Sequence, residues 1–186
     1  RRRVARRQGF FGGWLRGRSR VYLDEDATEG QLKSADLERY RFVHLATHGI
    51  VDEEHPGLSR LLLRPGAGPG EDGVLHLGEI YNLRMNADLV VLSACDTGLG
   101  RIARGEGIIG LTRGFLYAGA RSLLVSLWPV SDVATSSLVV DFYSELLAGR
   151  TKAEALRQAK LKTMARNPEL AKPYYWSSLV LVGQGR

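Results

Sequence analysis

Cysteine is scarce in this sequence: its 186 residues contain only one. A single cysteine excludes an internal disulfide and a cysteine-rich zinc site. The chain also shows no secretory leader, so we expect a reducing, cytoplasmic compartment. No hydrophobic run reaches the roughly 18 residues that span a bilayer, so we expect a soluble protein without a membrane partner.

Positive charge is concentrated at the beginning of the chain. The formal net charge is +6, and five positive charges fall within the first seven residues: Arg1, Arg2, Arg3, Arg6 and Arg7. Aromatic residues do not alternate with these arginines and no nucleic-acid motif follows, which disfavours a nucleic-acid partner. We expect residues 1–19 to be a solvated basic segment left from a longer protein, and residues 20–186 to form one domain.

Short apolar runs alternate with helical patterns along the chain. This alternation predicts an α/β fold, in which a mostly parallel sheet is covered by helices on both faces. The runs DLVVLS and RSLLVSL are continuously apolar, as is typical of strands buried on both sides. Strands are expected at residues 20–23, 41–47, 59–65, 88–93, 121–127 and 176–182, and a brief strand with a helical turn within 74–83. The principal helices are expected at 28–35, 108–117, 131–149 and 151–166.

Two residues with catalytic potential follow predicted strands directly. His48 comes after the strand that ends at Thr47, and Cys95 comes after the strand that ends near Ser93. The carboxyl ends of parallel strands meet at one edge of a sheet, where ligands and catalytic groups gather. A free thiol has a pKa near about 8.5, so it needs a neighbouring imidazole to become a nucleophile at neutral pH. The sequence therefore predicts a Cys95/His48 dyad.

Gly49 adds a feature that acyl transfer requires. Without a Cβ atom, its backbone allows a substrate to approach closely. Its N–H, together with that of Cys95, is predicted to stabilise the oxyanion of a tetrahedral intermediate. From the residues alone, an inert core cysteine and a structural histidine remain open alternatives.

Five motifs occur in order along the chain: HLATHG (44–49), ADLVVLSACDTGLG (87–100), GEGIIGLTRGFLYAGA (105–120), SLLVSLWPVSD (122–132) and PYYW (173–176). Together they resemble the CHAT domain, a caspase-like family related to separases. In caspases the catalytic histidine lies about 50 residues before the cysteine, and the spacing here is similar. The resemblance implies a caspase-hemoglobinase fold, a three-layer α/β sandwich, and frequent fusion in bacteria to helical-repeat or sensor modules.

The resemblance also implies roles for individual residues. His48 matches the family's general base, Cys95 its nucleophile, and Gly49 with Cys95 its oxyanion donors. The segment that contains Ser126, Trp128 and Asp132 is similar to the substrate-binding strand and loop of separases. An acidic residue there would contact a basic side chain at P1, so cleavage of protein substrates after a basic residue is expected. No metal or other cofactor is implied.

The sequence departs from the family pattern before Arg20, where a preceding strand and loop are not recognisable. The departure does not involve the dyad. Arg101 and Arg104, in the loop after the cysteine, are candidate self-cleavage points if the enzyme prefers basic residues. A catalytically silent or partner-gated domain that only binds or relays a signal remains an alternative.

Two further patterns lead to other functions. Residues 105–110 match G-x-G-x-x-G, but eleven residues separate Ser93 from Gly105, whereas a dinucleotide-binding fingerprint directly follows its strand. His44 and His48 have the spacing of a zinc pair, but on a strand they would stand about 13 Å apart, given about 3.3 Å of rise per residue. Both patterns are therefore disfavoured, and His55 and His76 carry no functional prediction.

Overall fold

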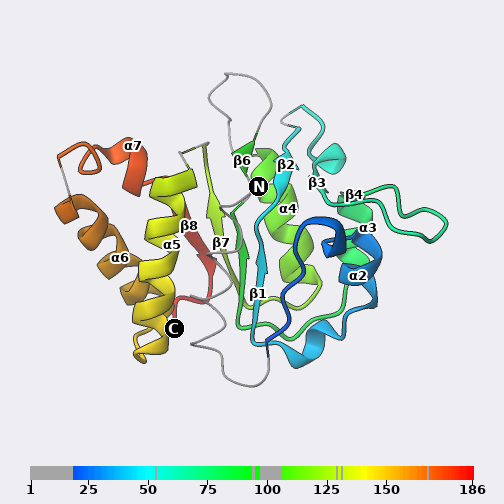
Figure 1. Ribbon diagram of the computed structural model, residues 1–186, viewed down its shortest axis with the longest axis horizontal. Helices are drawn as coiled ribbons and strands as arrows, with labels where there is room; N and C mark the ends of the chain where they lie inside the picture. Colours follow the sequence, from blue (N-terminus) through cyan, green and yellow to red (C-terminus); the bar gives the residue numbers. More distant parts are fainter. Residues whose placement is uncertain are drawn as a thin grey trace.

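The computed structural model describes residues 19–52, 54–93, 95–96, 106–128, 130, 132–166 and 168–186. The main sheet has the strand order β1 (Phe42–Leu45), β5 (Leu89–Leu92), β7 (Ser122–Ser126) and β8 (Leu179–Gly183). The first three strands are parallel, and β8 runs antiparallel to β7 (Figure 1). All four residues of β5 are buried, which explains its uninterrupted apolar sequence.

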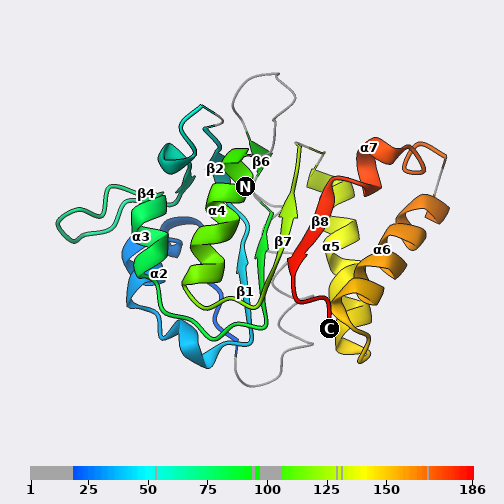
Figure 2. The ribbon, with the colours of Figure 1, turned by 180° about the vertical axis from the view of Figure 1, so that it is seen from behind.

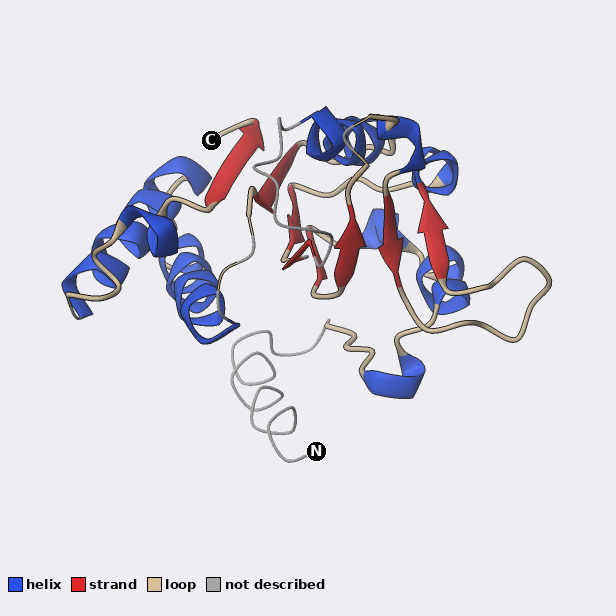
Figure 3. Ribbon diagram, turned by 90° about the horizontal axis from the view of Figure 1, so that it is seen from above, coloured by secondary structure: helices blue, strands red, loops and turns tan. Residues whose placement is uncertain are grey.

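Helices cover both faces of the main sheet. One face carries α2 (Glu29–Ser34), α3 (Leu77–Asn82) and α4 (Glu106–Tyr117), and the other carries α5 (Asp132–Leu147) and α6 (Lys152–Arg166) (Figures 2 and 3). The short helix α7 (Pro173–Trp176) precedes β8. The predicted class, a caspase-like three-layer α/β sandwich with a mostly parallel sheet, is confirmed. Among the described residues, no helix combines the length and apolar character needed to cross a membrane.

The two faces of β5 point into separate cores. Val90 packs with Leu123 and Phe115 on the α4 side, whereas Val91 packs with Leu124 and Phe142 on the α5 side. This alternation follows from the two-residue period of a strand. Because both faces are sealed by apolar side chains, β5 is held rigidly at the centre of the molecule.

A second, smaller sheet continues from the carboxyl edge of the first. Its strand order is β4 (Val74–His76), β3 (Arg60–Leu62), β2 (His48–Ile50) and β6 (Cys95–Asp96). β2 follows β1 after two residues, and β6 follows β5 after two residues. Three short 3₁₀ turns complete the described elements: η1 (Asp24–Asp26), η2 (Leu37–Arg39) and η3 (Pro56–Leu58).

One register runs through both sheets. In β1 and β5, each residue pairs with the residue 47 positions later, from Phe42 with Leu89 to Leu45 with Leu92. The same offset applies in β2 and β6, where His48 pairs with Cys95. The β1–β5 pairing therefore continues directly into the pairing of the two predicted catalytic residues.

Local signals for several helix ends are confirmed. The Thr28 side chain accepts a hydrogen bond from the Gln31 N–H at 3.1 Å, and the Thr151 side chain accepts one from the Glu154 N–H at 3.3 Å. Gly149, just beyond α5, has a φ of +91°, a left-handed conformation that favours glycine.

Three predicted boundaries were wrong. Residues 20–23 do not form a strand: Val21 is 59% exposed, and no described strand pairs with this segment. The strand expected at 41–47 ends at Leu45, and His48 begins a separate strand of the second sheet. Trp176 closes α7, so the last strand starts later, at Leu179.

The amino edge of the main sheet is held by Asp88, the residue before β5. Its carboxylate accepts hydrogen bonds from Arg41, which precedes β1, at 2.8 Å and from Arg121, which precedes β7, at 3.3 Å. Its backbone carbonyl accepts hydrogen bonds from the Ser122 hydroxyl at 2.6 Å and the Lys152 ammonium at 3.1 Å. Asp88 thus joins the starts of all three parallel strands.

We expect Asp88→Ala to lower the free energy of unfolding by about 1–2 kcal/mol, because two partly exposed charged hydrogen bonds are lost. Urea unfolding measures the change. Asp36→Ala is the control: Asp36 faces Arg39 at 3.8 Å and its side chain is 62% exposed. It should cost less than about 0.5 kcal/mol. Equal losses in the two variants would contradict the role given to Asp88.

Candidate active site

His48 is the first residue of β2, and its side chain is exposed at the carboxyl edge of the main sheet. The strand is fixed on one side by antiparallel pairing with β3, where His48 pairs with Leu62. The hydroxyl of Thr47 also donates a hydrogen bond to the Leu62 carbonyl. Pairing on one side thus holds the histidine while its ring remains accessible to a substrate.

Cys95 is the first residue of β6, on the other side of β2. Its backbone pairs in parallel register with His48, and Gly49 pairs with Asp96. Neighbouring strands lie about 4.8 Å apart. The structure therefore brings the backbones of the two predicted dyad residues together, at the edge where the sequence placed them. Gly49 is buried within β2.

His44 and Ser93 lie just below this edge, near the ends of β1 and β5. The Nε2 atom of His44 is 3.0 Å from the Ser93 hydroxyl oxygen, and its ring lies 5.8 Å from that of Tyr143 on α5. The pKa of His44 is lowered to about 4 because neighbouring protein atoms disfavour the charged ring, although the residue as a whole is solvent-exposed. His44 is therefore neutral at physiological pH.

The predicted substrate segment begins at Ser126, the last residue of β7, and lies at the same edge. The Ser126 hydroxyl donates to the carbonyl of Trp128 at 2.9 Å. The Trp128 indole N–H donates to the carbonyl of Tyr174 in α7, also at 2.9 Å. Sequence reasoning missed this role of α7, because the link joins residues 46 positions apart. Asp132 is the first residue of α5.

A profile of the CHAT domain family matches residues 4–184, nearly the whole chain. The chain belongs to the CHAT domain family. Tetratricopeptide repeat protein 28 of Mus musculus is similar to it, with 36% identity over 115 residues; the human protein of the same name is 34% identical over 115 residues. Each alignment covers 62% of this chain and 5% of the relative, so the chain corresponds to a small part of those proteins.

The glycine-rich segment of the CHAT domain does not form a nucleotide-binding turn in its described part. Gly107 and Gly110 lie inside α4, which begins at Glu106. A dinucleotide-binding fingerprint requires its glycines in the turn between a strand and a helix. The positions of Gly107 and Gly110 therefore do not support a dinucleotide-binding site. Arg101, Arg104 and Gly105 lie outside the described residues, as does the basic N-terminal segment through residue 18.

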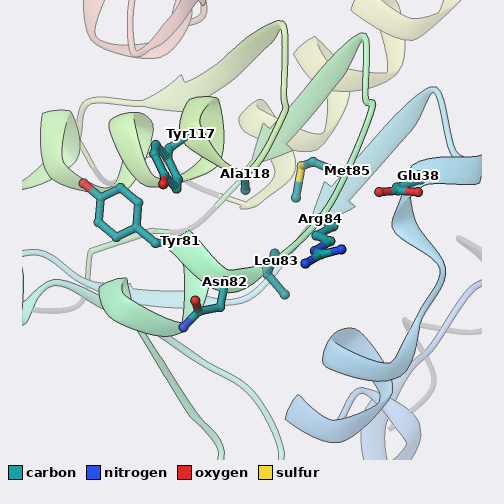
Figure 4. A pocket seen from close by; sticks show the side chains of 8 residues that line it. All are labelled: Glu38, Tyr81, Asn82, Leu83, Arg84, Met85, Tyr117 and Ala118. Atoms are coloured by element: carbon teal, nitrogen blue, oxygen red, sulfur yellow. The ribbon is translucent and has the colours of Figure 1, made fainter.

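A separate hollow lies at the other end of the CHAT domain. It has a volume of about 460 Å³ and is formed where α3 and α4 end (Figure 4). Tyr81 and Tyr117 meet there edge to face, with ring centroids 5.2 Å apart. None of the predicted catalytic or substrate residues lines this hollow. Its lining residues are Glu38, Tyr81, Asn82, Leu83, Arg84, Met85, Tyr117 and Ala118.

His44 predicts a pH dependence of stability. Between its folded pKa of about 4 and its ordinary value of 6.5, the unfolded chain binds more protons at this residue than the folded chain. Its stabilising contribution is therefore complete above pH 6.5 and is lost as pH falls towards 4. We expect His44→Gln to lose less stability than the unaltered protein between about pH 7 and about pH 4.5 in urea unfolding.

The control for this measurement is His55→Gln, because the His55 side chain is 71% exposed in a loop. Because this variant retains His44, it should keep the loss of stability that the unaltered protein shows between about pH 7 and about pH 4.5. If His44→Gln also kept that loss, the low pKa of His44 would be contradicted.

Proposed function

We propose that this CHAT domain is a cysteine endopeptidase that cleaves protein substrates by a Cys95/His48 dyad. The observation that carries the proposal is the parallel pairing of His48 with Cys95 at the carboxyl edge of the sheet. Cysteine peptidases need an imidazole within reach of the thiol, and adjacent strands in register supply that spacing. Membership of a caspase-like family points to the same chemistry.

In the proposed reaction, the Cys95 sulfur attacks the carbonyl carbon of the scissile peptide bond. His48 takes the thiol proton and donates it to the amine as the carbon–nitrogen bond breaks. His48 then removes a proton from water, which attacks the acyl-enzyme and releases the acid and the thiol. The backbone N–H groups of Gly49 and Cys95 are the proposed oxyanion donors, and no metal or other cofactor takes part.

The proposed substrate preference is a basic P1 residue. Asp132 is the proposed partner of that residue because α5 begins there, in the segment that follows β7. Ser126 and Trp128 are proposed to support the substrate, since their hydrogen bonds fix the segment against α7. A guanidinium or ammonium group paired with a carboxylate gives strong, charge-assisted hydrogen bonds.

The dyad is tested with fluorogenic peptides that carry arginine, lysine or aspartate at P1. Both Cys95→Ala and His48→Ala should lower kcat/KM by at least about 100-fold, because each removes an essential proton-transfer or nucleophilic group. Tyr117→Phe, in the distant hollow, is the control and should retain full activity. Peptide cleavage that survives Cys95→Ala would reject the dyad.

Specificity is tested separately. Asp132→Asn should reduce the preference for arginine over a neutral P1 residue by on the order of 100-fold, through loss of a charge pair. Asp141→Asn is the matched control on the same helix; its carboxylate pairs with Arg166 at 2.7 Å. A peptide-library profile gives the preference. Preference for aspartate or for large apolar P1 residues would overturn this assignment.

A second candidate is a catalytically silent or partner-gated signalling domain. It is favoured by the name of the relatives, which describes a repeat protein and states no peptidase activity. The match covers 5% of each relative, so we propose that a helical-repeat module accompanies and regulates the domain. A silent domain would cleave none of the peptides and would show ordinary reactivity of Cys95 towards alkylating reagents.

A further inference from the structure

We infer that His44 and Ser93 form a side-chain strap that positions the dyad; this inference rests on the proposed peptidase function. His44 lies four residues before His48, and Ser93 lies two residues before Cys95. The 3.0 Å contact between His44 Nε2 and the Ser93 hydroxyl therefore joins the two chain segments that lead to the dyad. Neither residue belongs to the proposed dyad, so both would act as positioning residues.

The strap lies where the main sheet ends and the smaller sheet begins. Backbone pairing of the main sheet ends with the hydrogen bond from the Ser93 N–H to the Leu45 carbonyl, at 3.1 Å. Pairing in the smaller sheet starts again at His48 and Cys95. The strap lies at this joint between the two sheets. It limits their relative movement where a small shift would change the distance between thiol and imidazole, and a displacement of about 1 Å can cost about 100-fold in rate.

The surroundings of His44 suit a strap. Its ring lies 5.8 Å from that of Tyr143 on α5, on the face of the sheet opposite to α4. The lowered pKa of His44 means that the imidazole is neutral at physiological pH, so one ring nitrogen can donate a hydrogen bond and the other can accept one. The contact thus persists across the pH range in which the dyad would work.

The experiment measures how fast iodoacetamide alkylates Cys95, the only cysteine in the chain, as a function of pH. In the unaltered full chain the midpoint of this profile should lie below the ordinary thiol value of about 8.5, because His48 stabilises the thiolate. Ser93→Ala removes the hydroxyl, and His44→Phe keeps a ring beside Tyr143 but removes its nitrogens. Both should move the midpoint towards about 8.5 and lower kcat on the order of 10-fold, with KM nearly unchanged.

Two controls separate positioning from stability. Ser93→Thr retains a hydroxyl and should restore the profile of the unaltered protein. Ser122→Ala removes a serine hydrogen bond from the same sheet, at 2.6 Å to the Asp88 carbonyl, but at the opposite edge. It should leave the alkylation midpoint unchanged. The double variant of His44→Phe and Ser93→Ala should lose no more activity than either single variant, because the two residues act through one contact.

The outcomes distinguish the strap from the peptidase proposal. A lowered midpoint in the unaltered protein that persists in Ser93→Ala would overturn the strap alone. An equal shift in Ser122→Ala would also overturn it, because general loss of stability would then explain the effect. An ordinary thiol midpoint in the unaltered protein, without peptide cleavage, would reject the peptidase proposal and the strap together.

Discussion

The parallel pairing of β1 with β5 is the constraint on which the rest of the structure depends. It forms at the centre of the molecule, where β5 is buried on both faces, and it fixes one residue of β1 against each residue of β5. If β5 shifted by one residue along β1, Val90 and Val91 would each point to the opposite face of the sheet, and the close packing of both hydrophobic cores would be lost. The pairing of His48 with Cys95 follows from a register that the hydrophobic cores enforce.

The two edges of the main sheet are stabilised in different ways. At the amino edge, the Asp88 carboxylate accepts hydrogen bonds from Arg41 and Arg121, which precede the two neighbouring strands. At the carboxyl edge, single hydrogen bonds between neutral groups join segments that are far apart in sequence, such as Trp128 with Tyr174. The carboxyl edge therefore leaves side chains such as that of His48 exposed, while the amino edge is joined by charged contacts.

The sequence predicted the buried strands and most helix boundaries because these depend on local patterns. DLVVLS and RSLLVSL are continuously apolar, and Thr28, Thr151 and Gly149 are standard cap signals. Strand β6 could not be predicted, since two residues carry no periodicity and its pairing comes entirely from β2. The sequence predicted that His48 and Cys95 lie near each other, because each follows a strand and the carboxyl ends of parallel strands meet at one edge. Their exact pairing, and the contact of His44 with Ser93, could be seen only in the structure.

The two links between the sheets have equal length, and this equality restricts how the sequence can evolve. Two residues separate Leu45 from His48, and two separate Leu92 from Cys95. A deletion in one link would bring His48 opposite a different residue of β6, whereas a matched deletion in both would conserve the pair. Insertions in the loop between β3 and β4, around residues 66–72, leave the pair intact. Among related sequences, insertions and deletions should therefore be found in that loop and be absent from the two-residue links at 46–47 and 93–94.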